Sequence, residues 1–162
     1  MNMTKGGTAA EAKARLIALI VPAGLLAGAY IAQYGFGLYP CDMCWWQRYP
    51  HFAAVLLALV AFVAQPPRIW ILLAGVAIFA SGVIVGFHAG VEYDWWEGFT
   101  SCSSIVQTDG DPLAAIMEAP LVRCDSAPWD LFGISLAGWN FLISCGSGIL
   151  IWALLFKRGN DA

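Results

Sequence analysis

Long apolar stretches alternate with shorter polar ones along the whole chain. Four apolar stretches are long enough to cross roughly 30 Å of hydrocarbon at ~1.5 Å per helical residue. They cover residues 16–34, 45–64, 69–88 and 131–156. A bilayer has no water to bind backbone amides, and stretches of this length lack the alternation of barrel strands, so each is predicted to be a helix. The sequence therefore predicts an all-α membrane protein, a four-helix transmembrane bundle that forms one domain over residues 1–162.

Three links of unequal length connect the predicted helices. Residues 65–68 read Gln-Pro-Pro-Arg, and because paired prolines cannot continue a helix, a tight turn is expected there. Residues 35–44 form a short loop and residues 89–130 a long one. Within the long loop, Asp-Pro at residues 111–112 is typical of a helix start, and the apolar residues after it share one face. A short surface helix is predicted at this place.

Lysine and arginine residues gather on one side of the predicted bundle. They precede the first helix, lie in the tight turn and follow the last helix, at Lys5, Lys13, Arg15, Arg68, Lys157 and Arg158. Cytoplasmic loops carry such an excess of cations, so both termini are predicted to be cytoplasmic and loops 35–44 and 89–130 periplasmic. Alternatively, residues 5–29 are a cleaved signal peptide ending at Ala-Gly-Ala, although the apolar run continues beyond it to Tyr34.

The composition agrees with a membrane protein and excludes another class. Hydrophobic residues make up 60% of the chain and charged residues only 12%. With a net charge of -3 and eight Lys plus Arg, no basic surface is available for a phosphate backbone, which excludes nucleic-acid binding. Of the five cysteines, four fall outside the apolar stretches on the predicted periplasmic side, where disulfides form and persist.

Cys41 and Cys44 form a C-x-x-C pair just before the second predicted helix. A disulfide that closes so small a ring stabilises a fold very little, so chemistry is the expected purpose. With a helix that starts near Trp45, Cys44 lies at a helix N-terminus, where the macrodipole favours a thiolate. Arg48 follows four residues later on the same face, and its permanent charge acts in the same direction. We expect a nucleophilic sulfur at the membrane boundary.

His88 ends the third predicted helix at the same boundary. Its imidazole can donate to a carbonyl oxygen. A quinone head group has two such oxygens, while its prenyl tail needs the bilayer, so Arg48, His88 and Cys44 are predicted to surround a quinone. The alternative for His88 is an interfacial pair with Glu92, four residues on. His51 shares the Cys44 face but ranks below His88, because its neighbourhood carries no second signal.

Cys102 and Cys124 lie in the long loop. Taken alone they would be interpreted as a structural staple, since a ring of this size gains stability from a disulfide. Beside a C-x-x-C pair on the same face, they suggest a relay by thiolate attack on disulfide. The fifth cysteine, Cys145, lies among small residues inside the fourth span and is predicted to pack there, while Asn140 of that span is predicted to bond another helix.

Three features together resemble the DsbB family of disulfide bond formation proteins. They are the segment PCDMCWWQRYP after the first span, the segment GFHAGVEYDWW at the third, and the loop pair Cys102 and Cys124. The resemblance covers nearly the whole chain. Met43 replaces a leucine that is common in the family, which is expected to be harmless because the residues between the cysteines tune the potential and do not carry the reaction.

The resemblance implies a quinone-dependent protein-disulfide oxidoreductase of the bacterial inner membrane, acting as a monomer with its active face in the periplasm. A reduced DsbA-like thioredoxin-fold protein would attack Cys102, and Cys124 would then attack Cys41 and release Cys44 beside the quinone. The resemblance also gives Arg48 the role of a quinone-proximal residue.

His88 has the same implied role beside the quinone, which is ubiquinone or menaquinone. The resemblance assigns no role to Gln47 or Glu92 and implies no metal.

Other functions remain open from the sequence. A vitamin K epoxide reductase-like protein also combines several spans with a C-x-x-C, but there the loop pair comes early and the C-x-x-C late, the reverse of this chain. A non-enzymatic metal site of four cysteines is a second alternative, which the long gap from Cys102 to Cys124 disfavours. A third has both pairs as inert disulfides.

Overall fold

The computed structural model describes residues 9–98, 103–104 and 121–157. Its helices are α1 (Ala9–Gly35), α2 (Asp42–Val63), α3 (Pro67–Glu92) and α5 (Leu136–Lys157). All four are long and apolar enough to cross a membrane, which confirms the predicted four-helix bundle. The short strands are β1 (Ser103–Ser104), β2 (Leu121–Val122), β3 (Asp130–Leu131) and β4 (Ile134–Ser135).

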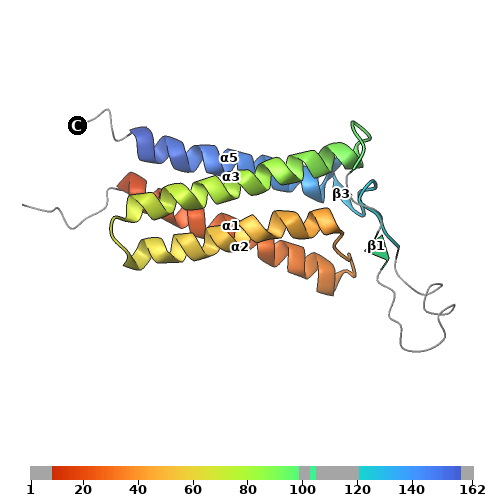
Figure 1. Cartoon of the computed structure of the whole chain (residues 1–162), viewed down its shortest axis with the longest axis horizontal. Coiled ribbons are helices and arrows are strands. Elements are labelled where there is room, and N and C mark those ends of the chain that lie inside the picture. Colours follow the sequence, from red (N-terminus) through yellow and green to blue (C-terminus); the bar gives the residue numbers. More distant parts are fainter. Residues whose placement is uncertain (1–8, 99–102, 105–120, 158–162) are drawn as a thin grey trace, which may run out of the picture.

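The helices form a closed ring in which α1 packs on α2, α2 on α3, α3 on α5 and α5 on α1. They run side by side, with the α2–α3 turn at one end of the bundle and the strands at the other (Figure 1). This arrangement makes α2 and α5 diagonal partners. The start of α2 and the end of α3 lie at the strand end, so the C-x-x-C pair and the third helix terminus meet there.

The core near the α2–α3 turn consists of small and aliphatic side chains. Its alanines repeat at intervals of four residues on α1 and α2, at Ala14, Ala18, Ala54 and Ala58. Small residues at this spacing let helix backbones approach closely where lipid offers no hydrophobic driving force. α3 and α5 also approach closely, since a Cβ on Gly82 would lie 2.6 Å from the Cys145 sulfur. This contact agrees with the packing role predicted for Cys145.

The helix ends differ from the predicted ones. α2 begins at residue 42, three residues earlier than expected, because Cys41 takes the N-cap position with extended backbone. α3 continues one turn past His88 to Glu92, which removes His88 from the boundary and buries it. α1 starts at Ala9, well before the predicted residue 16.

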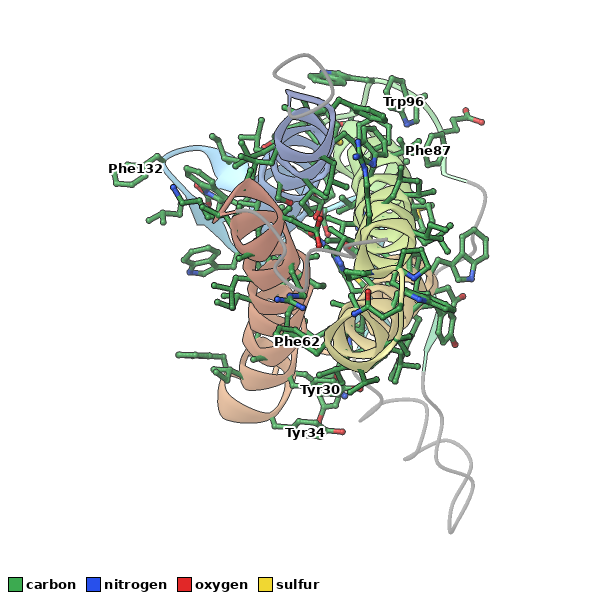
Figure 2. The ribbon with its side chains drawn as sticks, turned by 90° about the vertical axis from the view of Figure 1, so that its left-hand side faces the viewer. Tyr30, Tyr34, Phe62, Phe87, Trp96 and Phe132 are labelled. Carbon is green, nitrogen blue, oxygen red and sulfur yellow. The ribbon has the colours of Figure 1, made fainter. Side chains whose placement is uncertain are left out.

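The start of the fourth predicted span is wrong by five residues. β3 and β4 pair antiparallel ahead of α5, with Asp130 opposite Ser135 and Leu131 opposite Ile134. Between the strands, Phe132 and Gly133 both have positive φ, as in the type I′ turns that suit two-residue hairpins. Phe132 projects away from the helices (Figure 2) and is 88% exposed. The surface helix predicted after residue 111 lies outside the described residues.

Candidate dithiol site

Both sulfurs of the C-x-x-C pair lie at the start of α2. The Cys41 sulfur accepts a hydrogen bond from the backbone amide of Cys44 at 3.3 Å, which caps the helix. The Cys41 thiol donates to the Cys44 sulfur, with 2.9 Å between the two sulfur atoms. Cys44 is therefore in the first turn as predicted, while the capping position belongs to Cys41.

The two thiols of this pair are not equivalent. Donation to the Cys44 sulfur, together with burial, raises the pKa of the Cys41 thiol to about 12. Cys41 therefore keeps its proton at neutral pH. Negative charge belongs on the Cys44 sulfur, which accepts that hydrogen bond and lies in the first turn of α2, near the positive end of the helix dipole.

His88 reaches the pair from α3. Its Nε2 lies 3.7 Å from the Cys41 sulfur and also 3.7 Å from Oε1 of Glu92. The pair of His88 and Glu92 that was considered as an alternative does exist, but both side chains are buried, at 3% and 4% exposure, and not at a wet helix end. His88 therefore contacts both Glu92 and the Cys41 sulfur in one buried cluster.

A chain of hydrogen bonds between amides and imidazoles continues inward from His88. The Gln47 amide lies 3.4 Å from Nδ1 of His88, and Asn140 of α5 donates to Oε1 of Gln47 at 2.8 Å. Oδ1 of Asn140 lies 3.3 Å from Nε2 of His51 and accepts from the Ser144 hydroxyl at 2.8 Å. Neither Gln47 nor His51 has a role that the sequence predicts. Their signal was polarity inside an apolar span, which marks interhelical bonding or function.

Arg48 is buried between α1 and α2. Its guanidinium donates to Oε1 of Gln33 at 2.8 Å and to the carbonyl of Ala29 at 3.5 Å. It also lies 5.1 Å from the ring centre of Tyr30, labelled in Figure 2, and 4.8 Å from that of Trp45. A charge at this depth in an apolar bundle is expensive, and such charges mark functional sites.

One loop cysteine also reaches the site. Cys124 is buried in a cluster with Cys41, Met43 and Val91, against which Cys44 and Phe87 pack. The structure therefore brings a residue 80 positions away from Cys44 to the C-x-x-C pair, as a relay would need. Cys102, its predicted partner, lies outside the described residues.

A cavity of about 320 Å³ opens beside these residues. Its apolar lining comes largely from α1 and α5 and includes Gly24, Gly28 and Ile143. Its polar lining residues are Cys44, Gln47, Arg48, His51, His88, Glu92 and Asn140. An apolar cavity of this size with a few convergent polar groups is typical of a small-molecule site.

The sulfur cluster could also hold a metal ion. The ligand atoms of Cys41, Cys44 and His88 all lie within 4.8 Å of one another. Thiolate and imidazole are ligands that zinc accepts, and three of them leave one position open. Bound metal would need both thiolates and would therefore compete with disulfide formation.

Fold and site together define a helical membrane protein with a buried dithiol centre next to a ligand cavity. The family described as disulfide bond formation protein DsbB matches residues 11–154. Disulfide bond formation protein B of Verminephrobacter eiseniae is 31% identical over 153 residues, which are 88% of this chain and 84% of the relative. That of Shewanella frigidimarina is 29% identical over 146 residues, 85% of each chain. No solved structure matched the chain.

The chain belongs to the DsbB family. Membership makes it a thiol–disulfide oxidoreductase that acts in disulfide bond formation, and the four spans make it a membrane protein. An uncharacterised protein of Rickettsia prowazekii, RP370, is also similar, at 25% identity over 147 residues.

Proposed function

We propose that the protein is a quinone-dependent thiol oxidase, which reoxidises a DsbA-like thioredoxin-fold protein of the periplasm. The observation that carries the proposal is that Cys44, Arg48 and His88 line one cavity at the end of the bundle where the dithiol lies. The bundle is proposed to sit in the bacterial inner membrane, with both termini cytoplasmic and the sulfurs at the periplasmic end.

Electrons are proposed to enter through the loop cysteines. The reduced partner protein attacks the Cys102–Cys124 disulfide at Cys102, its second thiol completes the exchange, and two electrons are passed to the loop pair. The Cys124 thiolate then attacks Cys41, the Cys41–Cys44 bond breaks, and Cys44 leaves as a thiolate. Attack by Cys102 on the mixed disulfide restores the loop pair. The burial of Cys124 against Cys41 supports this order.

Electrons leave from the C-x-x-C pair. When the Cys41 thiol and the Cys44 thiolate re-form their disulfide, they release two electrons and the Cys41 proton. A bound quinone takes up both electrons with two protons, so the second proton comes from water. The Cys41 sulfur lies 3.7 Å from Nε2 of His88, which also contacts Glu92. Arg48 and His88 are proposed to hold the head group, and the apolar wall from α1 and α5 suits an isoprenoid chain.

The test uses the full chain in liposomes with decylubiquinone and a reduced periplasmic thioredoxin-fold protein. We expect stoichiometric loss of the oxidised quinone absorbance, which Cys44→Ser abolishes. Cys145→Ser is the matched control, since that thiol packs against Gly82 away from the cavity, and it should retain turnover. Unchanged turnover in Cys44→Ser would reject the mechanism. Menaquinone in a parallel sample decides between the two quinones.

The orientation needs a separate test in cells. A membrane-impermeant maleimide added from outside should label Cys41 or Cys44 after reduction. If only a reagent inside the cell labels them, the proposed topology is wrong.

A metal site is the second candidate function, because three ligand atoms converge. Metal analysis of protein purified without chelator separates the candidates. The oxidase predicts less than one zinc per ten chains, whereas a metal-binding protein predicts about one per chain.

A further inference from the structure

Two buried polar atoms in the described part of the chain lack a hydrogen-bond partner. They are Nδ1 of His51 and Oε2 of Glu92. Both residues line the same cavity, His51 from α2 and Glu92 from the end of α3. A buried polar atom without a hydrogen-bond partner is costly in an apolar bundle. Two such atoms beside one cavity indicate that a ligand supplies the missing hydrogen-bond partners.

Hydrogen-bond directions show that the unpartnered atom of His51 is an acceptor. The Asn140 amide nitrogen donates to Gln47, so it is Oδ1 of Asn140 that faces Nε2 of His51 at 3.3 Å. An amide oxygen only accepts, and therefore Nε2 of His51 carries the proton. In the neutral ring, Nδ1 then has a lone pair and no hydrogen.

Glu92 presents an acceptor in the same way. Gln47 donates to Nδ1 of His88, since its own oxygen accepts from Asn140, and this puts the His88 proton on Nε2. That N–H lies 3.7 Å from Oε1 of Glu92, and the Ser135 hydroxyl also bonds the carboxyl group. The contacts with Ser135 and His88 favour the ionised carboxylate, against burial, which favours the neutral acid. In the ionised form the remaining oxygen, Oε2, can only accept.

We propose that the cavity holds the reduced, hydroxyl-bearing form of the quinone more tightly than the oxidised form, through Oε2 of Glu92 and Nδ1 of His51. A hydroquinone has two hydroxyl donors on opposite sides of its ring, whereas a quinone has no donor. The two acceptors also differ in depth, since Glu92 lies in the cluster beside Cys41 and His51 is seven residues, or about 10 Å of helix, beyond Cys44.

This preference would aid the oxidation of thiols. A site that favours the reduced form raises the reduction potential of the bound quinone, so the quinone becomes a stronger oxidant for Cys41 and Cys44. A tenfold preference for a two-electron couple corresponds to about 30 mV. The inference rests on the proposed quinone function and assigns roles to two residues that neither the motifs nor the family description explain.

The test measures binding of decylubiquinone and decylubiquinol to the full chain without oxygen. A background of Cys41→Ser with Cys44→Ser prevents electron transfer, and serine still caps the helix. Quenching of tryptophan fluorescence gives both affinities, because Trp139 lines the cavity. We expect decylubiquinol to bind about tenfold more tightly, the effect of two hydrogen bonds.

His51→Phe and Glu92→Gln should each lower this ratio about threefold. Both substitutions nearly keep the shape of the original side chain. Either variant alone is sufficient for the test if the other fails to fold. Ser147→Ala is the control, a buried hydroxyl lost outside the cavity, and it should leave the ratio unchanged.

Equal affinities in the parent, or tighter binding of decylubiquinone, would overturn the preference while the quinone function stands. Failure of both probes to bind would overturn the quinone function as well.

Discussion

Replacing Asn140 by alanine tests whether the polar chain joins the diagonal helices. The side chain makes three hydrogen bonds, to Gln47 at 2.8 Å, Ser144 at 2.8 Å and His51 at 3.3 Å. Two of them cross from α5 to α2, which do not otherwise pack closely. Asn140→Ala therefore removes a connection through the centre of the bundle.

The expected loss of unfolding free energy in Asn140→Ala depends on whether values from water-soluble proteins or from membrane proteins apply. A buried group left without a partner costs about 1–3 kcal/mol in water-soluble proteins. In membranes the unfolded helices also find polar partners, and measured interactions average about 0.6 kcal/mol. The membrane value is the appropriate one here, and three bonds give about 2 kcal/mol for Asn140→Ala. Ser144→Ala loses one of the same bonds and should cost about 0.6 kcal/mol.

The assay is reversible unfolding by sodium dodecyl sulfate in mixed micelles, followed by circular dichroism. Turnover is measured on the same samples, and it should fall more in Asn140→Ala than in Ser144→Ala, because Gln47 then loses the partner that orients it toward His88. If Asn140→Ala costs no more than Ser144→Ala, the chain of bonds does not join the helices and the reasoning is refuted.

Three further predictions concern the site. The raised pKa of Cys41 keeps its thiol protonated at pH 8, so mass spectrometry should find Cys41 alkylated by iodoacetamide only as the pH approaches 12. In Cys44→Ser the alkylation should begin at lower pH, because the hydrogen bond to the Cys44 sulfur is the main cause of the raised pKa. Arg48→His loses a 2.8 Å hydrogen bond and should raise the quinone KM about tenfold with a smaller effect on kcat; an unchanged KM contradicts this. Gly28→Leu should weaken quinone binding at least about tenfold. Gly28 lines the cavity and a Cβ there meets no atom within 4 Å, so the leucine side chain would occupy the cavity itself. Gly146 is equally open but lies outside the cavity, and Gly146→Leu should bind quinone normally.

Local signals in the sequence predicted most of the bundle. Length and apolarity give four spans, because a bilayer requires continuous helices. The ends were less predictable, since a cysteine such as Cys41 is not a usual N-cap and nothing before His88 marks where α3 stops. The hairpin at Phe132 and Gly133 escaped detection because a bulky aromatic residue seldom takes positive φ, and the apolar strand residues looked like part of the span.

The candidate site was predictable residue by residue, but its connections were not. Spacing placed Cys44 and Arg48 near one face of a helix, and the span limits placed His88 at the same end of the bundle. The bond from Asn140 to Gln47 joins residues 93 positions apart on helices that are not neighbours in the ring. Only the packing of all four helices determines such a contact, so the sequence shows which residues are polar but not which partners they have.

The distribution of polar groups limits where electrons can travel. At the α2–α3 turn the buried core contains only alanine, isoleucine and leucine. The two buried histidines, the amides and the C-x-x-C sulfurs all lie in the other half of the bundle or toward its centre, next to one cavity. In the proposed relay, electrons that enter through Cys124 meet no buried ionisable group in the apolar half of the described core, so they would leave near the end where they arrive. This agrees with the proposed acceptor, a lipid-soluble molecule that reaches the cavity from within the membrane.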